Sequence, residues 1–487
     1  MLRNLTTAFL LSLVLLGMPS TKAQETLNLT LPEVVSMAKS NSPASAAARH
    51  RFNSGYWQYR TFKASLMPYM SLDATLPDLN RSISRITLPD GRDAFVKRSL
   101  ANYSSSISIK KPLGWTGGEL FVNSGLQRID VIGDSLSTSY LSTPLVFGIR
   151  QPLFGFNVYR WMKKIEPLRY QEAEKRSLED MENIALEATG YFFDVLLAAS
   201  DLSIAQLNEA NNDTIYKITK GRYNIGTIAE NDLLQMELAL LNSHTEVTRA
   251  SLALDVAQYK LRSYLGIKTQ APIRPIIGET LPTSKAELEI AQSEAHKNRS
   301  DAIAYQRRKI ESDRDVAQAK RENRFNVNVF ATYGLTQNAL NTTDVYKNPQ
   351  DQQQAAVGLQ IPVIDWGRAR AAISTAKSNR DLVYTTTEQQ MSDFDQEVFL
   401  KVMQYNLQHD QLSIATKADT VAQQRYELTK QRYLIGKIDI TQLNIASAEK
   451  DQARRSYLES LKSLWTLYYQ LRLLTLYDFE AKKALKD

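Results

Sequence analysis

The sequence of 487 residues contains no cysteine. This absence excludes a disulfide framework, a thiolate metal site and a lipid anchor on an N-terminal cysteine. No P-loop, dinucleotide fingerprint or nucleophile elbow occurs. Histidine is scarce, and its four positions are isolated, without a partner at metal-ligand spacing: His50, His244, His296 and His409. We therefore expect neither an enzyme nor a bound metal or cofactor.

Long apolar runs are confined to the first residues. Residues 1–23 contain Arg3, an apolar stretch from Ala8 to Leu16, and small residues before a predicted cleavage after Ala23, as in a secretory signal peptide. Its removal lowers the net charge from +7 to +5, because it contains two basic residues and no acid. No later run of 18 apolar residues predicts a transmembrane helix, which leaves a soluble protein or a membrane β-barrel. Basic residues are spread without blocks, so we expect no nucleic-acid binding.

Proline and glycine are rare in two long stretches. Residues 168–271 contain no proline and four glycines. No proline follows Pro362, and Gly436 is the only glycine after residue 368. These stretches predict two helical arms of over 100 residues, which alternate with turn-rich regions.

The two arms are copies of each other. YKITKGRYNIGTIAENDL (216–233) aligns with YELTKQRYLIGKIDITQL (426–443) at an offset of 210, and nine of the 18 positions are identical. Earlier in the chain the best offset is 257, so the first copy contains about 47 additional residues (257 minus 210). Such a duplication has to be recognised before a fold is assigned. We divide the mature chain into a first repeat (24–268), a linker (269–283) and a second repeat (284–487).

Each repeat changes periodicity twice. Helical patterns at about 31–66 and 284–322 come first, and alternating apolar and polar residues follow. The alternating segments are about nine to 11 residues long, which suits a transmembrane β-strand. The first repeat contains two more of them than the second, separated by the turn 112–118. The predicted strands are 69–77, 103–111, 118–128, 144–153, 324–337 and 353–363. A soluble sandwich is the alternative, but the helices that flank the strands are too long for it.

The helix predicted from about Trp366 to Leu434 would be roughly 100 Å long at 1.5 Å per residue. Its surroundings are rich in Gln, Asn, Ser and Ala, so it has to pack along other long helices. Its apolar positions step by four and three residues, which indicates a heptad seam: Val398, Val402, Tyr405, His409, Leu412 and Thr416. This composition favours a water-facing wall of coiled coils.

These features together resemble the outer-membrane efflux family typified by TolC. The resemblance rests on the order of elements, on IPVIDWGRARA at a strand-to-helix junction, and on R-Y-x-x-G at residues 222–226 and 432–436. It implies a mixed α+β membrane protein, a homotrimer whose β-barrel in outer-membrane lipid continues into a long periplasmic α-barrel. It also implies a passive exit duct that works with a periplasmic adaptor and an inner-membrane transporter. The alternatives are a type I protein secretion duct and a structural periplasmic coiled coil.

The extra strands are a departure from the family. Its members have two strands per repeat and 12 per trimer, whereas this first repeat has an additional hairpin near 101–129. A barrel has to match the α-barrel beneath it in circumference. We therefore expect the hairpin to pack outside the barrel or in its loops, rather than to widen it.

The resemblance also implies roles for residues at two helical tips, near 222–228 and 432–438. The adaptor would dock there, with Gly226 and Gly436 reversing the chain at positive φ. Exposed arginines would donate to the partner, and tyrosines would face an interface with one wet edge: Arg222, Arg432, Tyr223 and Tyr433. The alternative is that R-Y-x-x-G is only a helix cap.

The family closes its pore at the same tips. Asp232 and Tyr433 match its acidic and tyrosine partners, whereas Ile438 replaces its basic residue. Gln442 and Ile445 replace the two acids of its selectivity ring. We expect Lys437 and Asp439 to supply a substitute, with solvated charges at a helix start as the alternative.

Overall fold

The computed structural model describes residues 26–132, 137–278 and 281–485. The predicted signal peptide lies outside these residues. The chain forms two compact units. The tip unit comprises the described residues up to His50, Ser177–Arg299 and those from Asp395, and the sheet unit comprises Arg51–Arg176 and Ser300–Phe394.

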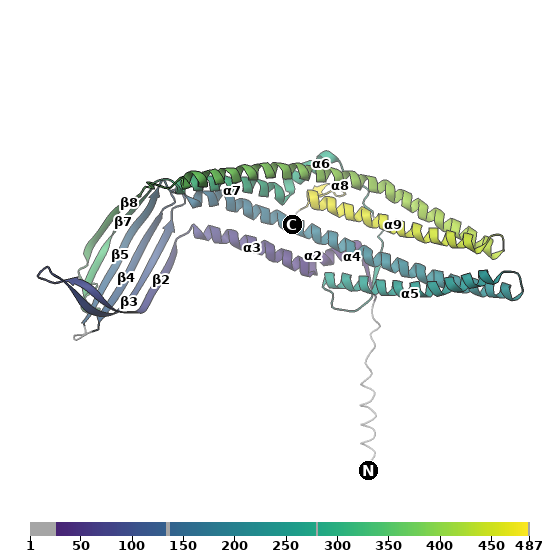
Figure 1. The fold of residues 1–487 in the computed structure, drawn as a ribbon, viewed down its shortest axis with the longest axis horizontal. Coiled ribbons are helices and arrows are strands. Elements are labelled where there is room, and N and C mark those ends of the chain that lie inside the picture. Colours follow the sequence, from purple (N-terminus) through teal and green to yellow (C-terminus); the bar gives the residue numbers. More distant parts are fainter. Residues whose placement is uncertain (1–25, 133–136, 279–280, 486–487) are drawn as a thin grey trace, which may run out of the picture. The chain divides into compact units, whose positions relative to one another are not determined.

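Long helices make up most of the chain (Figure 1). Two of them, α4 and α8, have 67 residues each, and the helices that follow them, α5 and α9, have 36 each. The long helix predicted to end at Leu434 is thus confirmed. Pro167 lies inside α4, although we expected the helical arm to begin after it. The helices are α2 (Leu31–Asn41), α3 (Pro43–Ser65), α4 (Val158–Asn224), α5 (Glu230–Leu265), α6 (Leu288–Asn298), α7 (Ser300–Glu322), α8 (Arg368–Leu434) and α9 (Ile440–Thr475).

The predicted helices 31–66 and 284–322 are each divided in two. Ser42 separates α2 from α3, and Arg299 separates α6 from α7. Both residues have extended backbone, with φ of −67° and −68°. Only the first break is followed by a proline, Pro43, so proline does not explain both. A small parallel pair precedes these helices, β1 (Leu27–Thr30) with β6 (Ile273–Ile276), and β6 lies in the predicted linker.

One antiparallel sheet contains all six predicted strands, in the order β2-β3-β4-β5-β7-β8 (Figure 1). Most strands are longer than expected, because pairing continues beyond the alternating segments. Their bounds are β2 (Tyr69–Thr87), β3 (Asp93–Pro112), β4 (Glu119–Val131), β5 (Ser137–Leu153), β7 (Asn326–Ala339) and β8 (Gln350–Gln360). A second small pair, β9 (Tyr477–Asp478) with β10 (Lys483–Ala484), follows α9.

The extra hairpin lies within this sheet. We expected it to pack outside the barrel or in its loops, but it is part of the same sheet as the other strands, because β3 pairs with β2 and β4 pairs with β5. Its turn is held in place by polar contacts. Lys111 Nζ donates to the Leu66 carbonyl oxygen at 2.6 Å, and Gln151 Nε2 donates to the Thr116 carbonyl oxygen at 3.3 Å. Periodicity identified the strands but could not identify their neighbours.

One described helix, α4, contains an 18-residue stretch that is apolar enough to cross a membrane. Of this stretch, 44% is buried inside the structure. A buried core helix passes the same test, so the finding is weak evidence for a membrane span. In the tip unit, α4 contributes Ile184, Phe192 and Phe193 to the core.

Two glycines of the sheet provide a matched test of its packing. A Cβ at Gly334 would lie 2.4 Å from the Leu145 carbonyl oxygen, whereas a Cβ at Gly358 would have no neighbour closer than 3.9 Å. We expect Gly334→Ala to cost about 1–3 kcal/mol, as overpacking does, and Gly358→Ala to cost far less. Melting of the strand signal in detergent measures the difference. Equal melting of both variants would contradict the close approach of β5 to β7.

Candidate functional site

The register gives the large sheet two chemically different faces. Residues that lie opposite each other in paired strands point to the same side. One side, the apolar face, carries exposed side chains such as Phe147 (52% exposed) and Val357 (70%). Its members are Met70, Leu72, Ile107, Ile109, Leu120, Val122, Phe147, Ile149, Val327, Val329, Val357 and Leu359. The other side, the polar face, is made largely of Ser, Thr, Asn and Gln, for example Ser106, Asn123 and Gln354.

Aromatic side chains lie near both ends of the strands, and those at one end belong to the apolar face. At one end, Arg128 lies between Tyr103 and Tyr140 on neighbouring strands, 5.5 and 5.9 Å from the two rings. At the other end, Trp115 and Trp366 are exposed next to the helices. A membrane β-sheet has an apolar band between two aromatic belts. The apolar part of β7, from Val327 to Leu335, has the nine residues that a tilted strand needs to cross the hydrocarbon.

The predicted helical tips are helix reversals with the same cap. Gly226 and Gly436 both have a φ of 74°, which confirms the positive φ expected of them. In the first tip, Thr227 N donates to the Arg222 carbonyl oxygen, and Gly226 N donates to the Tyr223 carbonyl oxygen. The residues at 432–437 repeat both hydrogen bonds. This pair of bonds is a Schellman motif, so R-Y-x-x-G is at least a helix cap in each tip.

Equivalent side chains of the two tips differ in burial and in their contacts. Arg222 is half-buried, and its Nη2 donates to the Leu434 carbonyl oxygen of the other tip at 3.0 Å. Arg432 is exposed. Tyr223 is exposed, whereas Tyr433 is only 7% exposed and its hydroxyl lies 3.4 Å from Thr219 Oγ1. Arg222 was expected to be exposed and is half-buried instead, because its side chain and that of Tyr433 join the tips to each other.

A small core lies behind this contact. Tyr433 belongs to a buried cluster drawn from both helical hairpins of the tip unit. The guanidinium carbon of Arg222 lies 5.8 Å from the Tyr433 ring centre, within reach of a cation–π interaction. The cluster consists of Ile215, Met236, Tyr426, Tyr433, Ile440, Leu443 and Ala446. Opening the tips would expose this cluster.

The predicted gate residues are near the tips but are not joined to one another. Asp439 is the N-cap of α9, and its Oδ1 accepts from Gln442 N at 2.9 Å. Asp232 lies in the first turn of α5, and Lys437 is exposed. In the described part of the chain, the hydrogen bonds and ion pairs connect neither Asp232 nor Lys437 to Tyr433. Asp439 therefore agrees with the alternative interpretation, a solvated charge at the start of a helix rather than a gate residue. As the N-cap it also stabilises α9.

Two exposed apolar seams run along the hairpins, and we did not expect either. On α8 an apolar residue recurs every seven positions, with exposed fractions of 46–69%: Leu400, Leu407, Ile414, Val421, Leu428 and Ile435. The seam on α5 comprises Leu234, Leu238, Leu241, Leu252, Val256 and Tyr259. The seam that we predicted on α8 is the buried one, through Val398, Val402, Tyr405 and Leu412. Thr416, its last predicted member, is exposed.

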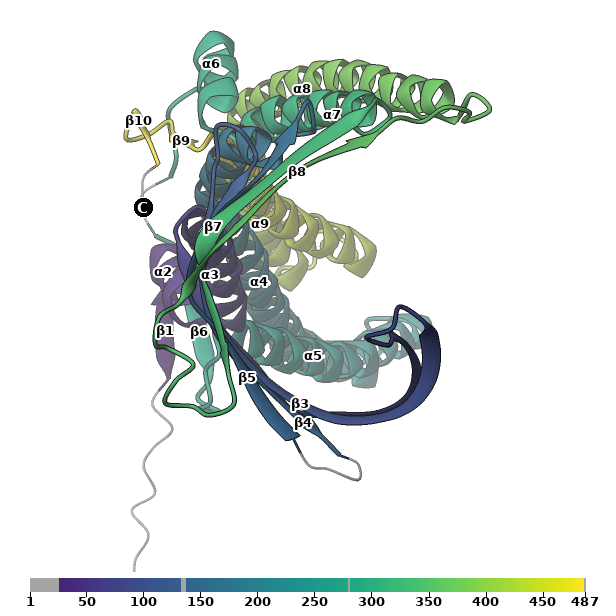
Figure 2. The same cartoon turned by 90° about the vertical axis from the view of Figure 1, so that its left-hand side faces the viewer.

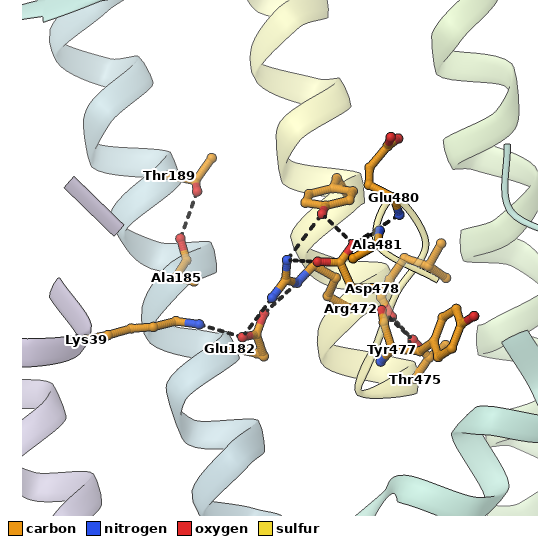
Figure 3. A network of polar contacts seen from close by, with 12 residues as sticks. Lys39, Glu182, Ala185, Thr189, Arg472, Thr475, Tyr477, Asp478, Glu480 and Ala481 are labelled. Carbon is orange, nitrogen blue, oxygen red and sulfur yellow. Dashed lines mark hydrogen bonds and ion pairs between the residues drawn. The ribbon is translucent and has the colours of Figure 1, made fainter. Parts of the chain in front are cut away.

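A polar network fixes three helices within the tip unit (Figure 3). Glu182 of α4, whose side chain is 5% exposed, accepts from Lys39 Nζ of α2 at 2.5 Å and from Arg472 Nε of α9 at 3.0 Å. Arg472 Nη1 also donates to Asp478 at 2.9 Å. Burial raises the pKa of Tyr468 to about 12, so its hydroxyl keeps its proton and donates to Asp478 at 3.1 Å. Sequence patterns did not indicate this network.

A two-faced sheet that leads into paired long helices is typical of outer-membrane channels. The outer membrane efflux protein family matches residues 119–267 and 285–475, and the chain belongs to this family. Its members are channels rather than enzymes, and the chain is therefore an outer-membrane efflux protein.

Solved outer-membrane channels have the same fold. The channel OprN is 16% identical over 91% of this chain and 89% of that chain, with a TM-score of 0.67. The Campylobacter jejuni CmeC channel is 14% identical over 94% and 87%, also with a TM-score of 0.67. VceC from Vibrio cholerae is 12% identical over 94% and 97%, with a TM-score of 0.65. At these identities the likeness concerns the fold alone. No curated protein matches the sequence significantly.

Proposed function

We propose that three copies of this chain form the exit duct of a tripartite efflux pump. The observation that carries the proposal is the two-faced sheet. Its apolar face suits outer-membrane lipid and its polar face suits a water-filled lumen. Substrates would pass through passively, because the energy would come from an inner-membrane transporter.

The free edges of the sheet support assembly into a barrel. Among the described strands, β2 and β8 each pair on one side only, and both are largely exposed. An open edge cannot remain in a membrane, because its backbone groups would have no hydrogen-bond partners. Pairing of β2 with β8 of a neighbouring copy would close the barrel. Three copies of six strands make 18, which gives a wider lumen than 12 strands would.

The helices support a periplasmic α-barrel built from two tandem repeats. The matched lengths of α4 and α8, and of α5 and α9, are what a duplication predicts. Each 67-residue helix is about 100 Å long, enough to cross much of the periplasm. The exposed seams on α5 and α8 would be covered by neighbouring copies.

We assign the docking of the periplasmic adaptor to the exposed part of the tips. Tyr223 and Arg432 are exposed there, and Arg432 lines a groove of about 950 Å³ between the ends of α8 and α9. Beside the seam residues, the groove combines apolar and basic side chains, including Ile438, Ile445 and Arg425. Such a surface suits a helical partner with apolar and acidic residues.

The contacts of Arg222 and Tyr433 would hold the duct closed. They join the two hairpins at the tips, and their loss would let the hairpins separate. Asp232, Lys437 and Asp439 would then place charges near the opening and influence its ion preference. This assignment differs from the family's gate, because the central arginine comes from the first tip.

The test is the conductance of the purified full chain in planar bilayers. We expect trimers that form channels, with larger or more frequent openings in Arg222→Met. The matched control Arg432→Met should leave conductance unchanged and reduce crosslinking to the co-purified adaptor. Asp439→Ser keeps the helix cap and removes the charge, so it should change only ion preference. A wild-type chain that forms no trimer or no channel would refute the proposal.

A further inference from the structure

The hairpin between β2 and β3 continues beyond the rest of the sheet. β3 pairs with β4 only as far as Leu100, opposite Val131, whereas β2 and β3 stay paired to Thr87 and Asp93. Residues 79–99 therefore form a two-stranded arm, which begins level with the last paired residues of β4 and continues past the ends of β4 and β5 (Figure 1, Figure 2). The arm has no buried core of its own that would explain its length, because most of its side chains with described burial are exposed.

The arm is basic. Residues 79–99 contain five basic and two acidic residues, a net charge of +3. Both acids already have partners inside the arm: Asp90 pairs with Arg92, and Asp93 pairs with Arg85. The ion pairs of the described residues include neither Arg81 nor Lys97, so these two cations face solvent.

One side of the arm mixes basic and apolar side chains. Arg81, Ile83 and Arg85 are alternate residues of β2 and therefore share that side. Lys97 lies opposite Ile83, and Phe95 lies opposite Arg85, so both are on the same side as well. Between the cations stand exposed apolar residues: Leu79, Ile83 and Phe95, the last 79% exposed. The other side carries Asn80, Ser82, Ser84 and Ala94 among its residues, and Arg98, opposite Ser82, is its one charged position.

The mixed side continues the apolar face of the sheet. Leu79 lies opposite Ala101, and Ala101 lies opposite Asp130. Asp130 is two residues from Arg128 on the same strand, so all of them lie on the apolar face. The arm thus begins just beyond the aromatic border made by Tyr103, Arg128 and Tyr140. Beyond such a border a membrane presents its headgroups, where apolar side chains and cations are both stabilised.

We propose that this arm binds the phosphate groups of anionic lipid headgroups in the outer leaflet. The proposal rests on the proposed function, because it takes the apolar face to lie in lipid. The +3 charge opposes pairing of the arm with its copies in neighbouring subunits. An acidic cargo in the lumen would meet the other side, which continues the polar face and has only Arg98 as a cation, whereas Arg81, Arg85 and Lys97 lie on the mixed side.

The experiment measures lipid retention by the full trimer in neutral detergent, using native mass spectrometry. The probes are a bisphosphorylated glucosamine disaccharide lipid and phosphatidylcholine. We expect the wild type to prefer the phosphorylated lipid, and 0.5 M salt, at roughly a 4 Å screening length, to remove most of the preference. The triple variant Arg81→Gln, Arg85→Gln and Lys97→Gln should bind it about a hundred-fold more weakly, at roughly 1 kcal/mol per cation.

Two further variants keep the outcome interpretable. Lys268→Gln with Lys377→Gln and Lys417→Gln removes the same charge from exposed positions outside the arm and should leave binding unchanged. Leu79→Ser with Ile83→Ser and Phe95→Ser should weaken both lipids, since it removes the apolar contact.

Equal binding by the wild type and the arm charge variant would overturn the inference, as would equal affinity for the two lipids. Association of trimers through their arms without lipid, seen by light scattering, would also overturn it. Channel formation by the same preparations is measured in parallel. If the variants form intact channels and their lipid binding is unchanged, only the proposal that the arm binds lipid is refuted. If no channels form, the proposed function is refuted.

Discussion

Leu407→Glu combined with Ile414→Glu is expected to abolish assembly of the trimer and to leave the single chain folded. Both side chains belong to the exposed seam on α8, with exposed fractions of 56% and 69%. They face away from the buried residues Val402 and Tyr405, so the chain itself does not need them. In an assembled α-barrel each would be covered, and burial of such a side chain stabilises by about 1.5–3 kcal/mol. An unpaired carboxylate in the same place costs several kcal/mol more.

Size measurement in detergent tests this prediction, with circular dichroism as the check on folding. The control is Leu407→Ile with Ile414→Leu, which keeps the seam apolar and should assemble normally. Leu238→Glu with Leu241→Glu on α5 should prevent assembly as well, because α5 carries the complementary seam. A double glutamate variant of α8 that still forms trimers would exclude this seam from the subunit interface.

The helical tips could be predicted to the residue because local chemistry determines them. Gly436 is the one residue of its arm that adopts positive φ at no steric cost, and its copy Gly226 supported the prediction of a chain reversal at both positions. The different uses of Arg222 and Arg432 could not be predicted. The two motifs differ only at their third position, Asn224 and Leu434, and the neighbouring helices decide which arginine reaches a carbonyl oxygen.

The extra hairpin shows what alternation leaves undetermined. The pattern at 103–111 and 118–128 fixed which side chains share a face, but nothing in it says which strands lie next to each other. The expectation of a constant barrel size then led to the wrong placement. The outer seam on α8 could have been found, since its seven-residue spacing from Leu400 to Ile435 is visible in the sequence. The network around Glu182 could not, because its residues are up to 439 positions apart (478 minus 39), from Lys39 to Asp478.

Glu182→Gln is expected to cost the tip unit about 3–5 kcal/mol, the usual effect of removing one partner from a buried ion pair. Glu182 is the carboxylate shared by Lys39 and Arg472, and its side chain is 5% exposed. Asp478 balances only one of the two cations, so the variant leaves an uncompensated positive charge between α2, α4 and α9. The loss should appear as faster hydrogen exchange in α2 and α9, with little change in α7 of the sheet unit. Hydrogen exchange is measured for each helix separately, because a chain of two units need not unfold in one step.

A double substitution separates the charge imbalance from the loss of a contact. Lys39→Met with Glu182→Met removes one cation and one anion, and leaves Arg472 paired with Asp478 at 2.9 Å. We expect it to recover most of the stability lost in Glu182→Gln, because buried ion pairs can be replaced by apolar residues at little cost. The control Asp194→Asn breaks an exposed pair with Lys462 and should change stability by less than about 1 kcal/mol. If the double variant is as unstable as Glu182→Gln, geometry at Glu182 and not charge balance holds the three helices together.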